Sequence, residues 1–360
     1  MNAHPIVDVW QATVHQLLEG ISQPLREALA VLSLGMALGR HCHSSRIAAC
    51  TPSAATPASS RRRLERLLAN PHLKAAQVTA ALVRSLAAAC PERPWVLIID
   101  ETDRDEQIRT LQILLAYKHR ALPLAVQAYR PDFGQGRRPR LLWRLLGIIH
   151  RALPAGTSVT VLVDRGLAWP DLVRCCQKWG WHYVLRIQGQ TAVWPQGQNT
   201  SRRADAWLPP VGAPPFGGWA RVFKVHGWLE CYFTAVQVPG AQEPALLISD
   251  APGAWRMYRR YGRRTWCEEA FRDEKSSGFC WRQSQVHDPA HATRLLVVML
   301  LAMYVCVVLG ALLIQRGWRR RFDPHPQRLW SYFKLGLCGL AHAFVAPHTG
   351  PPLPVPLVPV

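Results

Sequence analysis

The first ninety residues carry apolar side chains at helical spacing, with polar side chains between them. Residues 51–60 interrupt this pattern with two prolines and five Ser or Thr, which predicts a linker or an exposed turn. On either side of it the period of three to four residues predicts helices. These are expected over residues 7–18, 25–38, 61–70 (a basic helix ending near Asn70-Pro71) and 75–89.

From residue 95 the pattern changes to short, continuous apolar runs rich in β-branched residues, which are typical of buried strands. Strands are predicted over residues 95–99, 108–117, 121–129, 158–163 and 183–186, with helices over 141–153 and 170–179. The order strand–strand–strand–helix–strand–helix–strand predicts an α/β fold in which helices flank a mixed sheet.

Two of these strands lead into an aspartate: Asp100 follows the first run, and Asp164 follows the fourth. The carboxyl ends of central strands are where α/β folds build their sites. A single Asp in such a place is explained by a helix cap or a turn. Two of them, on strands that could be neighbours, favour a shared site.

The remainder of the chain divides into three further patterns. Residues 191–253 alternate in short runs rich in Pro, Gly and Trp, which predicts a β-rich insertion. Residues 295–314 contain no charge and are long enough to cross a membrane. A helix buried in a large domain has the same composition, and we favour burial. The end of the chain is proline-rich and is expected to be a disordered or polyproline-type tail.

The charge balance indicates the kind of partner. The chain has 43 Lys and Arg against 23 Asp and Glu, a net charge of +20, and only six of the cations are lysine. Arginine matches phosphate oxygens through its planar fork of donors, so nucleic acid is the leading partner class. The run at residues 61–66 could contact nucleic acid or could be a solvated helix face.

The ten cysteines predict neither a disulfide framework nor a metal site. The sequence contains no C-x-x-C pair, and the His41-Cys42-His43 cluster has no further ligand beside it, as a tetrahedral site would need. Buried thiols in a reducing compartment are expected instead. The N-terminus shows no pattern typical of a signal peptide.

Residues 261–275, reading YGRRTWCEEAFRDEK, predict one helix with an unusual polar face. At 100° per residue, a single stripe contains Tyr261, Arg264, Glu268, Arg272 and Lys275. An i,i+4 ladder of charges on a solvated face would account for this stripe. A row of cations around one carboxylate also suits a helix that lies along a polyanion.

Together with the two strand aspartates, Glu268 completes a set of three carboxylates. Phosphoryl transfer develops charge on the entering and leaving oxygens, and a pair of Mg²⁺ ions can neutralise both. Magnesium prefers a few carboxylate ligands, with water and substrate completing its shell. Cations on the same helix face would then hold phosphates beside the reacting bond.

The spacing Tyr, two residues, Arg, three residues, Glu, six residues, Lys resembles the signature of bacterial insertion-sequence transposases of the DDE type. Tyr261, Arg264, Glu268 and Lys275 match it without a gap. The Asp100-x-Thr and Asp164-Arg-Gly contexts and the β-rich insertion before the Glu also match. The resemblance covers residues 60–315. It implies a ribonuclease-H-like catalytic core, a mixed sheet flanked by helices, with a helical N-terminal region and a β-rich insertion.

The resemblance also implies roles for these residues. Asp100, Asp164 and Glu268 would be the catalytic residues and would bind Mg²⁺, for which Mn²⁺ could substitute. DNA would be contacted by Tyr261, Arg264, Arg272 and Lys275. Such an enzyme cleaves DNA at the terminal inverted repeats of the element and transfers the strand into target DNA. It works as a homodimer on paired ends, in the bacterial cytoplasm at the nucleoid, without a membrane.

Two other functions are open from the sequence. An inactive, transposase-derived DNA-binding protein would keep the same fold, although the presence of all three carboxylates argues against it. A protein with a single membrane span at residues 295–314 is the other. The expected organisation is a helical region that could contact DNA (1–90), the first part of the core (91–190), the insertion (191–254), the second part of the core (255–340) and a Pro-rich tail (341–360).

Overall fold

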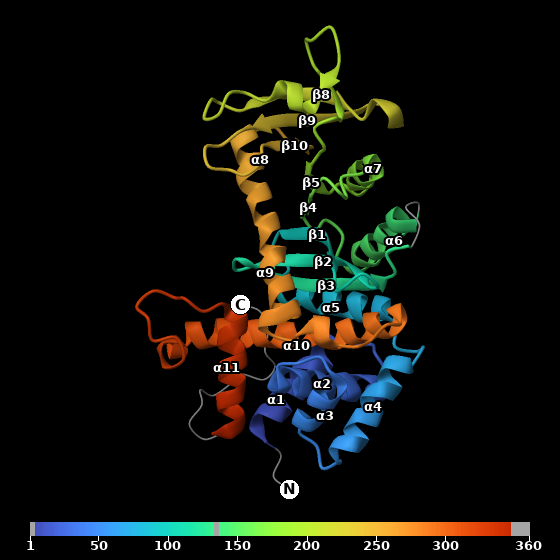
Figure 1. Ribbon diagram of the computed structural model, residues 1–360, viewed down its shortest axis with the longest axis vertical. Coiled ribbons are helices and arrows are strands. Elements are labelled where there is room, and N and C mark those ends of the chain that lie inside the picture. Colours follow the sequence, from blue (N-terminus) through green and yellow to red (C-terminus); the bar gives the residue numbers. More distant parts are fainter. Residues whose placement is uncertain (1–3, 133–136, 347–360) are drawn as a thin grey trace.

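The computed structural model describes residues 4–132 and 137–346. Five helices form the N-terminal region, as the helical spacing predicts: α1 to α4 pack together at one end of the molecule, and α5 lies beside strand β3 (Arg120–Tyr129) and helix α6 (Arg137–Ala152) (Figure 1). Their bounds are α1 Pro5–Leu17, α2 Gln23–Gly39, α3 Ser44–Cys50, α4 Pro57–Ala69 and α5 Ala75–Ala89.

The predicted linker is shorter than expected. Helix α4 already begins at Pro57, so the second half of residues 51–60 is helical, and α3 was not predicted. Proline at the first helical position has no donor to lose, and the Thr56 hydroxyl accepts a hydrogen bond from the Ser59 N–H at 3.2 Å. The residues that suggested a linker are therefore the start signal of a helix.

Ten strands form one sheet in the order β3-β2-β1-β4-β5-β10-β9-β8-β6-β7. Strands β1, β4 and β5 are parallel, and on the other side of β1 the sheet continues with β2, antiparallel to β1, and β3, antiparallel to β2. The bounds are β1 Trp95–Asp103, β2 Arg109–Tyr117, β3 Arg120–Tyr129, β4 Val159–Val163, β5 His182–Arg186, β6 Ala192–Pro195, β7 Arg202–Arg203, β8 Phe216–Val222, β9 Leu229–Val236 and β10 Ala245–Ser249. The mixed sheet flanked by helices confirms the predicted α/β class.

The β-rich segment after residue 190 continues the core sheet. Strand β10 pairs with β5, with Leu247 opposite Arg186, and carries β9, β8, β6 and β7 beyond it. The sheet therefore extends as one surface from the N-terminal helices to the far end of the molecule (Figure 1). An element that crosses this sheet can contact both halves of the chain.

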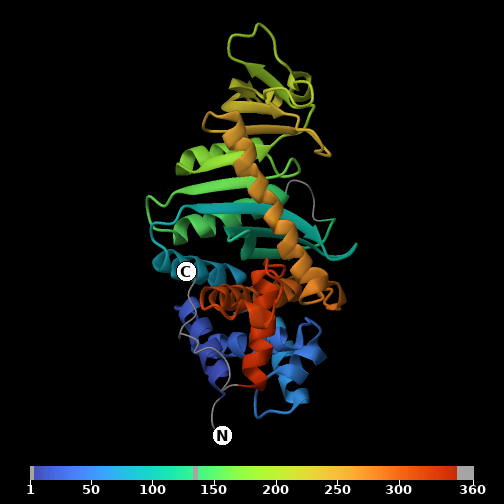
Figure 2. The same ribbon diagram turned by 90° about the vertical axis from the view of Figure 1, so that its left-hand side faces the viewer.

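That element is the helical path over residues 254–277, which runs diagonally across one face of the sheet (Figure 2). It contacts β9, β10 and β5 at one end and β1 and β3 at the other. Helices α6 Arg137–Ala152 and α7 Pro170–Trp179 lie against other parts of the fold, α6 packing on α5 and α7 on β5.

The prediction of one regular helix over residues 261–275 is wrong in detail. The path consists of α8 Ala254–Tyr261, a 3-10 turn Gly262–Thr265, α9 Trp266–Arg272 and a π-helical turn Asp273–Ser277. Gly262 has low helix propensity and lies where the helix tightens. The wider π turn rotates every later side chain relative to a 3.6-residue period. The single polar stripe is therefore broken after Arg272.

The apolar segment forms α10 Pro289–Gln315, which is long and apolar enough to cross a membrane. In its most apolar stretch of 18 residues, however, 89% of the residues are buried inside the protein. It packs against α2, β3 and α11 Tyr332–Val345. A Cβ on Gly310 would lie 1.8 Å from the Tyr332 carbonyl oxygen, so the α10–α11 crossing requires glycine. Burial against protein is the environment of a core helix.

The predicted Pro-rich tail begins later than expected. Helix α11 continues to Val345 because its apolar residues pack on α10, so residues 341–345 belong to the fold. Residues 347–360, which contain all six prolines of the predicted tail, fall outside the described residues.

Candidate active site

Asp100 and Asp164 lie side by side because their strands are parallel neighbours. The register places Ile99 of β1 opposite Val163 of β4, so each aspartate is one residue beyond this pair. The prediction that the strand ends at Asp100 is wrong, because pairing with β2 extends β1 to Asp103. Both carboxylates are partly buried, with side-chain exposures of 16% and 27%.

The guanidinium of Arg264 joins the three predicted carboxylates. Its Nη2 donates to Asp100 Oδ2 at 2.7 Å and lies 3.7 Å from Asp164 Oδ2. Its Nη1 donates to Glu268 Oε1 at 3.0 Å. Arg264 is 15% exposed. The structure therefore brings Asp100, Asp164 and Glu268 around one cationic group, as their proposed shared role requires.

Tyr261 also reaches this group of carboxylates. Its hydroxyl donates to Asp164 Oδ1 at 3.1 Å, and burial raises the pKa of Tyr261, so the hydroxyl remains a donor. Arg186, at the end of β5, lies 3.7 Å from the same oxygen. The sequence analysis missed Arg186. The only available signal was its place at the end of a parallel strand, like Asp164.

The two aspartates differ in their electrostatic environment. Burial raises the pKa of Asp100 above its usual value, although Arg264 and the Cys267 thiol oppose this. Burial also acts to raise the pKa of Asp164, but the Arg165 backbone N–H, Arg264 and Tyr261 outweigh it, and the pKa of Asp164 is lowered. Asp164 is thus the more firmly ionised of the two.

Cys267 is a second residue that the sequence analysis missed. Its thiol lies 3.2 Å from Asp100 Oδ2, and burial raises its pKa, so the thiol is protonated and donates. The signature segment contains this residue directly before Glu268, but its predicted position outside the polar stripe concealed the contact.

The other predicted site residues are more dispersed. Glu268 is 59% exposed and meets the aspartates through Arg264. The pKa of Lys275 is lowered by partial burial and by Arg282, and Asp103 and Asp100 are near enough to oppose this shift.

Arg272 does not join this group. It is 62% exposed and pairs with Glu269 at 3.0 Å, and Glu269 accepts from Arg120 of β3 at 2.8 Å. The neighbouring carboxylate Glu269, which the sequence offered as a rival to Glu268, is thus held by β3 and not by Arg264.

Glu274, 2% exposed, is the most deeply buried carboxylate near the site, and no sequence pattern indicated its role. It accepts a hydrogen bond from Gln112 Nε2 at 2.8 Å, and Gln112 lies opposite Asp100 in the β1–β2 register. Burial raises the pKa of Glu274 to about 7. The Gln112 Oε1 atom has no hydrogen-bond partner within the described residues, so an uncharged partner suits this position.

Replacing Glu274 with glutamine is therefore expected to change the pH dependence of stability. A carboxyl whose pKa rises from 4.5 to about 7 on folding stabilises the fold fully below about pH 4.5. That contribution is lost as the pH rises through 7. The unfolding free energy of Glu274→Gln minus that of wild type should therefore rise by about 2–3 kcal/mol from about pH 5 to about pH 8.

Urea denaturation of both proteins at the two pH values measures this difference. Asp273, whose pKa burial also raises to about 7, is present in both proteins and largely cancels in the comparison. Parallel stability–pH curves for the two proteins would show that Glu274 is ionised in the folded state.

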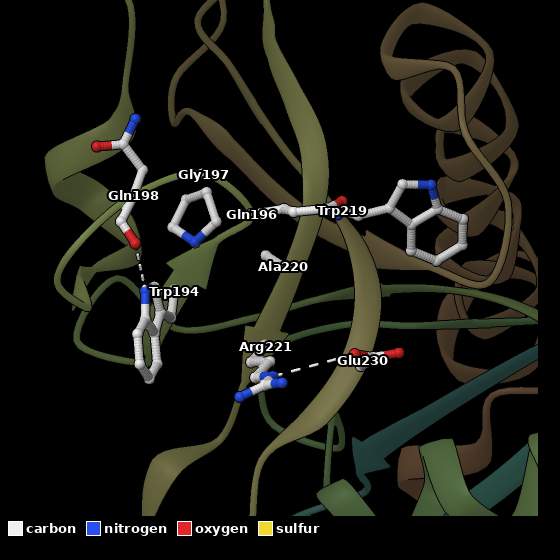
Figure 3. Close-up of a pocket in the computed structure, with 9 residues that line it drawn as sticks. Trp194, Gln196, Gly197, Gln198, Trp219, Ala220, Arg221 and Glu230 are labelled. Carbon is white, nitrogen blue, oxygen red and sulfur yellow. Dashed lines mark hydrogen bonds and ion pairs between the residues drawn. The ribbon is translucent and has the colours of Figure 1, made fainter.

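A cavity of about 230 Å³ opens beside the two aspartates. It is lined by Asp100, Glu101, Asp103, Arg109, Asp164, Gly166 and Leu167. A larger cavity of about 400 Å³ lies between β6 and β8 (Figure 3). There the only carboxylate is Glu230, which faces Arg221 at 4.0 Å. Because phosphoryl transfer with metal ions needs several carboxylates, the smaller cavity is the candidate site.

The donor set fits a hard divalent cation. Within residues 4–132 and 137–346 no three His, Cys, Asp or Glu side chains stand grouped as a ready metal site. Three carboxylates nevertheless share the Arg264 guanidinium, which shows that this position favours positive charge. Carboxylate oxygens are the ligands that Mg²⁺ prefers, and it needs only a few of them from protein.

Comparison with protein families gives one match, to the transposase DDE domain, over residues 91–305. The match spans β1 to most of α10 and so contains Asp100, Asp164 and the complete helical path. It confirms the resemblance and the ribonuclease-H-like core that the resemblance implied. No curated protein matches the chain.

Proposed function

The chain belongs to the transposase DDE domain family, and on that basis we propose that it cleaves DNA at the terminal inverted repeats of an insertion sequence and transfers the freed strand into target DNA. The single observation that supports this most directly is the convergence of Asp100, Asp164 and Glu268 on one guanidinium. Glu268 lies one helical turn from Arg264, whereas Asp100 and Asp164 come from two strands that are distant in the chain. A fold that uses only its charge to bind DNA has no need to bring these two aspartates to the same guanidinium.

In this proposal Asp100, Asp164 and Glu268 would hold Mg²⁺, for which Mn²⁺ could substitute. The bound metal would supply neutralisation of charge on the entering and leaving oxygens and activation of a nucleophile. Asp164, the more firmly ionised aspartate, is ready as a ligand without losing a proton. Asp100, with its raised pKa, ionises more readily once a cation lies beside it.

The cationic and aromatic residues would act on the DNA. Arg264, released from the carboxylates by a competing cation, can turn its fork of donors to a phosphate. Tyr261 holds Asp164 in place through its hydroxyl. Lys275 and the exposed Arg272 would contact the DNA backbone further along the helical path. Burial of the site around Arg264 strengthens each of these charge interactions.

The remaining parts of the proposal follow from kinship. The protein would act as a homodimer on paired ends, in the cytoplasm at the nucleoid. The helical region 1–90, the core in its two parts, 91–190 and 255–340, and the insertion 191–254 would be its functional divisions. The exposed arginines of α4 give the helical region a surface that could contact DNA.

A cleavage assay on duplexes that carry the flanking inverted repeats tests the function. The wild-type protein is expected to cut the strand at the repeat terminus only with Mg²⁺ or Mn²⁺. Glu268→Ala is expected to cut at least about 10²-fold more slowly, because one of the ligands is lost. Rates from gels of end-labelled DNA measure this difference.

Glu230→Ala is the matched control, since it removes an exposed glutamate from the larger cavity and should cleave at the wild-type rate. A wild-type protein that cuts no faster than Glu268→Ala, while both bind the repeats, would identify an inactive DNA-binding descendant of a transposase.

A further inference from the structure

The connection between α10 and α11 together with the first turn of α11, residues 316–334, carries six Lys or Arg and a single carboxylate. We call this segment the basic arm. It contains the 3-10 turn Trp318–Arg321 and loops out beyond the end of α10 (Figure 1). Among the described contacts of Asp100, Asp164 and Arg264, none involves a residue of the arm. The arm is therefore a charged surface apart from the carboxylates.

The one acidic side chain of the arm is used internally. Asp323 is 1% exposed, and its Oδ2 accepts the backbone N–H groups of Leu329 at 2.9 Å and Trp330 at 3.0 Å. Arg319 lies 3.5 Å from the same carboxylate and donates to the His325 carbonyl at 2.8 Å. This pair fixes the fold of the loop, so the arm is ordered without a ligand.

The other five cations of the arm are exposed, and three of them lie on aromatic rings. The guanidinium of Arg321 is 4.1 Å from the centre of the Trp318 ring, and that of Arg328 is 4.4 Å from the Tyr332 ring. The Lys334 ammonium is 4.1 Å from the Trp330 ring. Because stacking restrains these long side chains, they lose less conformational freedom when they contact a ligand.

We propose that the basic arm binds the phosphate backbone of duplex DNA, outside the carboxylate site. Ordered cations with no exposed carboxylate among them complement a regular array of phosphates, and five of the six are arginine. An anionic membrane would attract the same charges. Duplex DNA is favoured because the neighbouring helix α10 is buried in protein. The inference depends on the proposed function only in taking DNA as the partner.

The test removes three exposed cations of the arm in the full-length variant R320A/R328A/K334A. Binding to a labelled duplex of about 30 base pairs without the terminal repeats is measured by anisotropy between about 50 and 300 mM salt. Each lost phosphate contact lowers the slope of log K against log salt by about 0.9. We expect the slope to fall by about 2–3 and the Kd near 100 mM salt to rise at least about tenfold.

Two further variants separate a binding role from a loss of total charge or of folding. R320K/R328K/K334R keeps the charges and should retain the wild-type slope. R84A/R151A/K178A removes three exposed cations from α5, α6 and α7 and should change the slope by less than half as much. The proposal is overturned if the slope is unchanged in R320A/R328A/K334A, or if R84A/R151A/K178A lowers the slope by the same amount.

One additional measurement and the binding conditions complete the design. Binding to phosphatidylserine vesicles is measured by flotation. If the arm variant no longer floats with the vesicles but binds the duplex normally, the arm belongs to a membrane surface and the proposal is overturned. Duplex binding is measured without a divalent cation and on DNA without the repeats, so failure of cleavage and failure of the arm are read separately.

Discussion

Replacement of Asp100 by asparagine is expected to reduce Mg²⁺-dependent cleavage of the repeat ends by at least about 10³-fold. Asparagine keeps the shape of the side chain but provides a neutral oxygen, a poorer ligand for a hard dication. Asp100 is the more buried of the two aspartates, 16% exposed against 27%, and it contacts both Arg264 and Cys267. Replacing a residue that only orients a metal ligand typically lowers metal affinity or activity 10- to 100-fold. A larger loss of cleavage therefore distinguishes a metal ligand from the residues that support it.

Single-turnover cleavage rates, measured together with repeat binding, test this expectation. Binding should remain within a few-fold of wild type, because phosphate contacts dominate affinity. The control is Asp171→Asn, which removes an exposed aspartate paired with Arg174 on α7 and should cleave normally. Cleavage by Asp100→Asn at more than a tenth of the wild-type rate would exclude Asp100 as a metal ligand.

Replacement of Arg264 by alanine is expected to destabilise the metal-free fold by about 3–5 kcal/mol, the typical cost of leaving buried charge without its partner. Asp100 would lose its nearest cation and Asp164 one of its two, and burial already disfavours the ionised form of Asp100. Addition of Mg²⁺ should then restore more stability to the variant than it adds to wild type, since a metal can neutralise the same oxygens.

Thermal melts with and without Mg²⁺ measure this coupling and need no activity. Arg264→Lys keeps the charge but not the fork and should be intermediate. The matched control is Arg174→Ala, which breaks an exposed ion pair worth at most about 1 kcal/mol and should show no extra response to Mg²⁺. An equal Mg²⁺ response in Arg264→Ala and wild type would show that no metal binds these carboxylates.

The sequence predicted the regular elements well where local pattern and burial agree. Helices over residues 75–89 and 170–179 were predicted at their observed bounds because their apolar period and end signals are local. The start of α4 was missed because the same prolines serve a turn and a helix N-terminus. The end of β1 was missed because pairing with β2 extends the strand past its apolar run.

The site was predictable in its residues and not in its arrangement. The spacing of Tyr261, Arg264 and Glu268 identified the residues that meet Asp100 and Asp164. It could not show that Arg264 lies inside the group while Arg272 turns away to Glu269. That difference depends on contacts with distant strands, since Arg264 donates to Asp100 and Glu269 accepts from Arg120, and hydrophobic periodicity does not report such contacts.

By itself, the sequence determined the α/β order of elements, the basic surface and the carboxylates that the family match later placed in a transposase DDE domain. These are properties of residue type and spacing, which act locally along the chain. Only the tertiary structure decided that β10 joins the insertion to the core sheet, that α10 is buried, and that Cys267, Arg186 and Glu274 lie near the aspartates. Each of these depends on contacts between residues distant in the chain, whose energies no local pattern records.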